Sequence, residues 1–97
     1  MINIIIADHQ AIFRAGIAKI LAVEDDLRIV GQPASLDQLL LCIEKLRARV
    51  LVISSGFTDK MEDIQKLARR SGIAMLMLAA VAMVGAWFTT APAKQSS

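Results

Sequence analysis

The chain has 97 residues, a formal net charge of +2 and a single cysteine. This length fits one small domain, and so weak a charge gives no electrostatic argument for nucleic-acid binding. The lone Cys42 excludes a disulfide framework and a cysteine-based metal cluster. Because Cys42 lies in an apolar helical pattern, we expect it to be a small core residue.

The first expected element is a strand over residues 2–7, whose apolar run stops abruptly at Asp8 and His9. A continuous apolar run favours a strand buried on both faces of a parallel sheet. A helix over residues 10–23 should follow and pack back onto that sheet. Its apolar positions recur at spacings of three and four: Ile12, Phe13, Gly16, Ile17, Ile20 and Leu21. Ligand chemistry collects at the carboxyl ends of parallel strands, so Asp8 and His9 are the first candidate functional residues.

Strands and helices alternate along the rest of the chain. We expect a strand over residues 27–31, a helix over 36–47, a strand over 50–53, a helix over 60–70 and a strand over 73–79. Ser35 is the expected cap of the second helix, and Thr58 or Asp59 of the third. The expected inward-facing residues are Leu36, Leu39, Leu40, Ile43 and Leu46 in the second helix, and Met61, Ile64, Leu67 and Ala68 in the third. The alternation predicts βαβ units, a parallel sheet and right-handed crossovers.

Three stretches carry a family pattern: INIIIADHQAIFRAGIAKIL, LRIVGQPASLDQLL and VLVISS. Together they resemble the receiver domain of bacterial response regulators, and most of all the LuxR/NarL type joined to a helix-turn-helix. The matching residues are Ala7, Asp8, Phe13, Arg14, Gly16, Val30 and Gly31. The resemblance covers about residues 1–79. It implies an α/β, flavodoxin-like fold with a parallel sheet of about four strands and an apolar C-terminal helix, incomplete at the C-terminus. The expected organisation is a receiver-like domain over 1–79, an apolar segment over 80–91 and a disordered tail over 92–97.

The family's chemistry is phosphoryl transfer to an aspartate, assisted by Mg²⁺ held by carboxylates. Asp8 matches the first acidic residue, but His9 stands in the position of the second, and Ser54 in that of the phosphoacceptor. The switch hydroxyl falls at Ala79 or Ala80, and no equivalent of the family's lysine is evident. Imidazole is a poor Mg²⁺ ligand, and a serine cannot form an acyl phosphate. We therefore expect a phosphorylation-independent pseudo-receiver that is not an enzyme, with no cofactor and with Asp8 as only a weak Mg²⁺ candidate.

Several other interpretations of these residues remain open from sequence. Asp59 is an alternative phosphoacceptor, and Asp8 is a candidate cap for the first helix. His9 and Asp8 are two candidate ligands for a transition metal. The turn of residues 54–56 is a candidate phosphate-binding turn. Strands 1 and 3 are neighbours in the receiver topology, so Ser54 and His9 are also a candidate nucleophile and base.

The last quarter of the chain changes character, since residues 71–93 carry no charge. Three interpretations compete: a fourth strand and an apolar helix that complete a shortened receiver, a membrane helix over residues 72–91 behind Arg69 and Arg70, or a truncated or frameshifted product. We expect a cytoplasmic protein that forms a homodimer or pairs with a related regulator. No residues are left for a DNA-binding helix-turn-helix, so any effect on transcription should be indirect.

Overall fold

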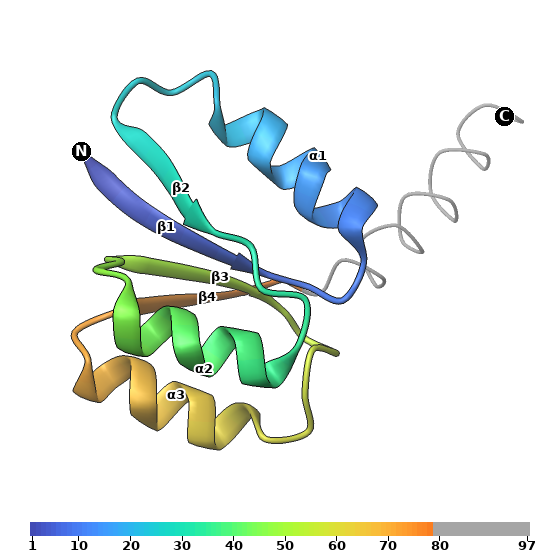
Figure 1. Ribbon diagram of the computed structural model, residues 1–97, viewed down its shortest axis with the longest axis vertical. Coiled ribbons are helices and arrows are strands. Elements are labelled where there is room, and N and C mark those ends of the chain that lie inside the picture. Colours follow the sequence, from blue (N-terminus) through green and yellow to red (C-terminus); the bar gives the residue numbers. More distant parts are fainter. Residues whose placement is uncertain (79–97) are drawn as a thin grey trace, which may run out of the picture.

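The computed structural model describes residues 1–78, in which strands and helices alternate as the sequence predicts (Figure 1). The strands are β1 (Ile2–Ala7), β2 (Leu27–Gly31), β3 (Val50–Ser54) and β4 (Ala74–Leu78). The helices are α1 (Ala11–Leu21), α2 (Leu36–Lys45) and α3 (Met61–Arg70). The bounds of β1 and β2 are those expected, and the other elements begin or end within two residues of the expected positions. The expected end of β4 at residue 79 lies outside the described residues.

The four strands form one sheet in the order β2-β1-β3-β4, and all neighbouring strands are parallel. This confirms the parallel sheet and the contact between the first and third strands. Helix α1 covers one face of the sheet, and α2 and α3 cover the other (Figure 1). The expected α/β, flavodoxin-like architecture is therefore correct for the part of the chain that the structure describes.

The core lies on both faces of β1, as its unbroken apolar run predicts. Ile5 and Ala7 belong to the cluster on the α2 and α3 side, which also contains Leu39, Ile43, Ile64 and Ala68. Ile4 and Ile6 belong to a smaller cluster with Val52, against which Ile17, Ala18 and Leu21 of α1 pack. Residues Ile4, Ile5, Ile6 and Ala7 are all at most 4% exposed. We call the face with the smaller cluster the α1 side of the sheet.

The expected inward face of α1 is partly wrong. Ile12 is 83% exposed and Ile20 is 70% exposed, and no residue of α1 is fully buried. Within residues 1–78, α1 has no second helix beside it, so only the stripe that rests on the sheet is covered. The same correction applies to Leu40 in α2, which is 38% exposed, whereas Leu39 and Ile43 are buried as expected.

The ends of α2 and α3 show which of the expected capping residues cap a helix. Ser35 caps α2 as predicted, because its hydroxyl accepts a hydrogen bond from the Gln38 N–H at 3.3 Å. Neither Thr58 nor Asp59 caps α3: the N-cap residue is Lys60, and the Thr58 hydroxyl accepts from the Lys60 N–H before the helix begins. Helix α3 ends at Arg70 with Ser71 as its C-cap, and Gly72 follows with a φ of +72° that permits the reversal into β4.

The described part of the uncharged region is a paired strand. Residues 74–78 form β4 beside β3, which agrees with a fourth strand and not with a helix that begins near residue 72. No helix among residues 1–78 has the length and apolar character needed to cross a membrane. The rest of the candidate membrane segment, the apolar segment over 80–91 and the tail over 92–97 lie outside the described residues, as do Ala79 and Ala80.

Candidate functional site

The candidate residues meet at the carboxyl edge of the sheet. Asp8 directly follows β1, and Ser54 is the last residue of β3. Ala7 and Ile53 are register partners, so Asp8 and Ser54 are the next residues along two neighbouring parallel strands. The topology thus brings together two positions that are far apart in the sequence.

Asp8 is the one buried polar residue among residues 1–78, at 8% exposure. Its Oδ1 accepts a hydrogen bond from the Gln10 N–H at 2.8 Å, and its own N–H donates to the Pro33 carbonyl oxygen at 3.3 Å. The N-cap of α1 is Gln10, which makes no side-chain cap bond. Asp8 is therefore not the helix cap: its carboxylate holds the turn that leads from β1 into α1.

His9 connects three loops at this edge. Its Nδ1 lies 2.8 Å from the Ala34 carbonyl oxygen, and its Nε2 lies 2.6 Å from the Phe57 carbonyl oxygen. The imidazole also stacks on the Phe57 ring, with a centroid distance of 4.7 Å and an interplanar angle of 11°. Phe57 is buried, so the stacked pair joins the edge of the site to the core. His9 thus ties the β1–α1, β2–α2 and β3–α3 loops together.

These contacts argue against a serine nucleophile activated by His9. A general base must hold its acceptor nitrogen towards the nucleophile's hydroxyl. Both His9 nitrogens instead face carbonyl oxygens, of Ala34 and of Phe57, and neither faces Ser54. The structure brings Ser54 and His9 to the same edge but gives them no nucleophile–base contact in the described residues.

The donor set also fits Mg²⁺ poorly. Mg²⁺ prefers oxygen ligands in near-octahedral geometry, usually with carboxylates. Asp8 supplies the one carboxylate beside Ser54 on neighbouring strand ends, and one of its oxygens already accepts a hydrogen bond. Residues 1–78 contain no group of three or more His, Cys, Asp or Glu side chains arranged to hold a metal ion. This also leaves His9 and Asp8 as an isolated pair.

Two backbone N–H groups at the turn after β3 already donate hydrogen bonds within the protein. The Ser55 N–H donates to the Leu78 carbonyl oxygen at 2.8 Å, and the Phe57 N–H donates to the Ser54 carbonyl oxygen at 3.1 Å. A phosphate-binding turn needs several free N–H groups directed at the anion. The N–H groups of Ser55 and of Phe57 are therefore already bonded within the protein, which leaves fewer donors for an anion at this turn.

Two contributors to the site were not predicted from sequence. Phe57 supplies the stacking surface and an acceptor for His9, and the Arg14 guanidinium donates a hydrogen bond to the Asp8 carbonyl oxygen. The available signal for Phe57 was a large aromatic residue in an otherwise polar loop. Cys42 lies apart from this edge, half-buried against the larger core cluster, and burial raises the pKa of its thiol.

Comparison with solved structures settles the fold family. A structure of RcsB from Salmonella enterica serovar Typhimurium, bound to the promoter rprA in the presence of phosphomimetic BeF3⁻, matches with a TM-score of 0.70 and 26% sequence identity. A structure of the two-component response regulator RcsB in complex with DNA matches with a TM-score of 0.67 and 26% identity. Residues 1–78 form a response-regulator receiver fold.

Each match covers 78% of this chain, which spans only 41% of each RcsB chain. No protein-family model matches the chain, and no curated protein matches it either. The receiver assignment thus rests on the α/β sheet and on similarity to these response regulators, as the sequence resemblance implied. The DNA contacts described for RcsB belong to RcsB.

Proposed function

We propose that this chain is a receiver-like signalling module that works without accepting a phosphoryl group and acts by binding another protein. The observation that carries this proposal is Ser54 at the carboxyl end of β3, beside Asp8, where an active receiver has its acceptor aspartate. A serine hydroxyl cannot form the acyl phosphate of that family, so the family's reaction lacks its usual acceptor at this position.

The environment of His9 supports the same proposal. His9 occupies the position of the second carboxylate, and its ring is held by two carbonyl oxygens and by Phe57. In an active receiver this position adds negative charge for Mg²⁺. These contacts join the loops through the protein's own groups, which suits a module that a partner protein binds rather than one that phosphorylation switches. On this proposal the chain is not an enzyme and needs no cofactor.

The proposed partner is a second copy of the chain or a related regulator, in the cytoplasm. Direct DNA binding is not part of the proposal: within residues 1–78 a strand separates each helix from the next, so none forms a helix-turn-helix pair. Any effect on transcription would be indirect, through the partner. An electrophoretic shift of duplex DNA by the isolated chain, specific in sequence and reduced by salt, would contradict this.

Intact mass spectrometry tests the phosphate-independent function directly. The chain is incubated with Mg²⁺ and a small phosphodonor such as acetyl phosphate, and we expect no mass increase of one phosphoryl group. A stable acyl-phosphate adduct would contradict the proposal. Asp59, exposed in the loop before α3, is then the residue to test, because loss of the adduct in Asp59→Asn would assign it as the acceptor.

Titration with Mg²⁺ tests the metal part of the proposal. We expect the amide resonances of Asp8, His9 and Ser54 to stay nearly unchanged in the millimolar range, because one carboxylate gives too little charge to dehydrate the ion. The double variant His9→Asp, Ser54→Asp adds two carboxylates at the same edge and should acquire binding. Equal shifts in both proteins would contradict the assignment of these positions.

A further inference from the structure

The two edges of the described sheet differ in how they resist pairing with a further strand. Strand β2 forms one edge and β4 forms the other. An edge strand presents unpaired N–H and C=O groups, and proteins commonly protect such an edge with a charge, a bulge or a proline. In β2, Arg28 is exposed, and Pro33 follows the strand by two residues. The register between β1 and β2 also shifts between Ile4 and Ile5. The β2 edge is therefore protected.

Strand β4, at the other edge of the described sheet, carries none of these protections. Its sequence is AMLML, and its register with β3 is regular over all of its residues. Leu76 is 54% exposed on the α1 side of the sheet, and Met77 is 55% exposed on the opposite side. Because both faces of the strand are equally open, the feature that β4 offers to a partner is its edge.

The hydrogen bonds between β3 and β4 show which backbone groups point outward. In a parallel pair, alternate residues of a strand bond to a given neighbour. The Ala74 N–H donates to the Arg49 carbonyl oxygen at 2.9 Å, and the Leu78 carbonyl oxygen accepts at 2.8 Å from the N–H that directly follows β3. The even-numbered residues of β4 therefore bond towards β3. The N–H and C=O groups of Met75 and Met77 point to the outer edge, which is unpaired within residues 1–78.

We propose that β4 pairs edge to edge with β4 of a second copy of this chain, antiparallel, about a twofold axis at Leu76. In this register Met75 of each copy lies opposite Met77 of the other, and each such pair exchanges both of its N–H···O bonds. The register thus uses the outward groups of both residues. Such a contact is closed, because the joined sheet ends on both sides in the protected strand β2.

The composition of β4 favours a second copy as the occupant. Residues directly opposite each other in antiparallel strands interact closely, and like charges there are destabilising. Pairing of β4 with itself opposes only apolar residues, since AMLML carries no charge. Within residues 1–78, β4 is also the sheet edge that lacks protection, so the open edge that suits it is another β4. This inference rests on the proposed function for the kind of partner and adds the surface by which that partner binds.

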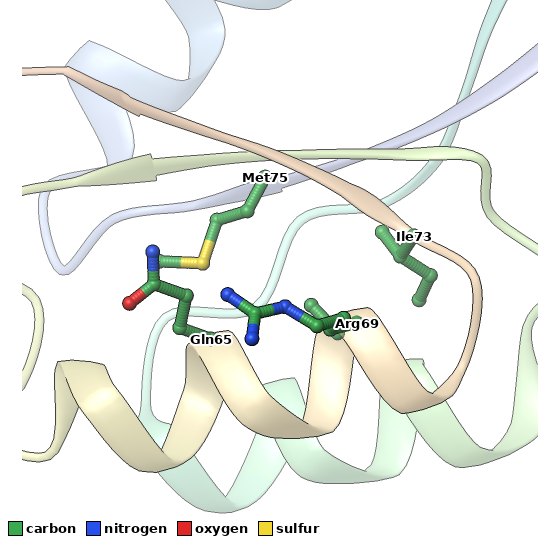
Figure 2. A pocket seen from close by; sticks show the side chains of 5 residues that line it. Gln65, Arg69, Ile73 and Met75 are labelled. Atoms are coloured by element: carbon green, nitrogen blue, oxygen red, sulfur yellow. The ribbon is translucent and has the colours of Figure 1, made fainter.

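The side chains beside the edge fit this register. The Met75 side chain extends between Gln65 and Arg69 of α3 (Figure 2). An open hollow of about 200 Å³ is lined by Gln65, Ala68, Arg69, Ile73 and Met75. Met77 of the second copy lies opposite Met75 on the same face, so its flexible side chain enters this hollow. On the α1 side, Leu76 packs against Leu76 of the second copy. Pairing therefore covers the exposed side chain on each face of β4.

Charge variants at Leu76 test the twofold axis. Sedimentation velocity of the full chain over a range of concentrations should show a monomer–dimer equilibrium. Leu76→Lys and Leu76→Glu each place two like charges opposite each other, so each variant alone should lose the dimer. A mixture of the two variants should regain it, which also shows that both variants are folded. The matched control is Leu41→Lys in α2, where Leu41 is 53% exposed, and it should leave the dimer unchanged.

Cysteine cross-linking tests the register in a Cys42→Ser background. Leu76→Cys places two thiols at directly opposite, non-hydrogen-bonded positions, where the Cα atoms lie about 4.5 Å apart and a disulfide can form. Met77→Cys, on the same strand and equally exposed, places them diagonally, about 7–8 Å apart, beyond the reach of an unstrained disulfide. We expect a disulfide-linked dimer from Leu76→Cys under mild oxidation and little from Met77→Cys.

Several results would overturn this inference. A monomer at every concentration would mean that no second copy binds the edge. A dimer that persists in Leu76→Lys would place the contact on another surface, and equal cross-linking at positions 76 and 77 would contradict the register. The last two results leave the proposed function standing, because it requires a partner but not this edge. An acyl-phosphate adduct in a chain that dimerises through Leu76 would instead overturn the proposed function alone.

Discussion

Two glycines of this chain lie in opposite steric settings. Gly31 ends β2 under α2, and a Cβ added there would lie 2.9 Å from Leu46 Cδ1 and 3.1 Å from Cys42 Sγ. Gly16 lies within α1, where an added Cβ meets no atom within 4 Å. An added Cβ at Gly31 would therefore displace the ends of two side chains, whereas at Gly16 it would meet open space.

Alanine at the two positions should change stability in opposite directions. Gly31→Ala forces the ends of two side chains to move and should lower the free energy of unfolding by about 1–2 kcal/mol. Gly16→Ala removes backbone freedom from the unfolded chain and should raise it by about 0.5–1 kcal/mol. Urea denaturation followed by circular dichroism measures both. Changes of the same sign would contradict the packing around Gly31.

The Cys42 thiol should react more slowly than an ordinary thiol near neutral pH. Burial raises the pKa of Cys42, so in the folded chain the reactive thiolate forms only at higher pH than in the unfolded chain. As the pH rises through the ordinary thiol pKa, the unfolded chain loses its proton first, and the stability of the fold should decrease. Alkylation by iodoacetamide, followed against pH with and without urea, measures this. Identical pH profiles would refute it, and Cys42→Ala should remove this part of the stability change.

At the scale of elements, the loops at the carboxyl edge are joined through one side chain. One ring nitrogen of His9 lies within hydrogen-bond distance of a carbonyl oxygen in the loop before α2, and the other lies within that distance of a carbonyl oxygen in the loop before α3. The ring also stacks on Phe57. A neutral imidazole has one N–H and donates to one of these two carbonyl oxygens. The stacking holds the ring regardless of which oxygen it bonds to, so the two interactions can be separated by substitution.

His9→Ala should loosen both neighbouring loops. It loses the hydrogen bonding and the stacking, and should lower the free energy of unfolding by about 1–2 kcal/mol, whereas His9→Phe keeps the stacking and should lose less, about 1 kcal/mol. Faster amide exchange at residues 33–35 and 55–58 should accompany the loss in His9→Ala. Unchanged exchange in these loops would mean that His9 does not connect them.

The elements themselves were largely predictable because their signals are local. The apolar run that ends at Asp8 defines β1, and Ser35 caps α2 through a bond three residues away. The exposure of Ile12 and Ile20 was not predictable, because periodicity shows that a helix has an apolar side but not how much of it a neighbouring element covers. That depends on which elements pack beside α1, and this is a property of the assembled sheet.

The candidate site was likewise predictable from sequence only in part. Asp8, His9 and Ser54 were found because parallel strands end at one edge, which the order of strands and helices already implies. The stacking of His9 on Phe57 was missed because it joins residues 48 positions apart through loop geometry. The cap expected at Thr58 or Asp59 was wrong for a related reason: the start of α3 is set by how that loop packs, and the helix begins one residue later than expected.

At the scale of the whole molecule, the two layers that cover the sheet are unequal. Helices α2 and α3 each bury two residues, Leu39 and Ile43 in one and Ile64 and Ala68 in the other. Helix α1 buries none completely and rests on the sheet through half-buried side chains. Burial of apolar surface is the main source of local stability, so among the helices of residues 1–78 we expect α1 to open at the lowest free energy.

Native-state hydrogen exchange should therefore rank the three helices. We expect the amides of α1 to exchange fastest through local opening, while those of α2, α3 and β1 exchange close to the limit of global unfolding. Ile64→Ala should lower global stability by about 2–5 kcal/mol, because it empties a fully buried site. Ile17→Ala, at a half-buried position, should cost less and mainly accelerate exchange within α1. Equal protection of α1 and α3 would contradict this ranking, since it would require α1 to be held as firmly as the helices that bury their apolar faces.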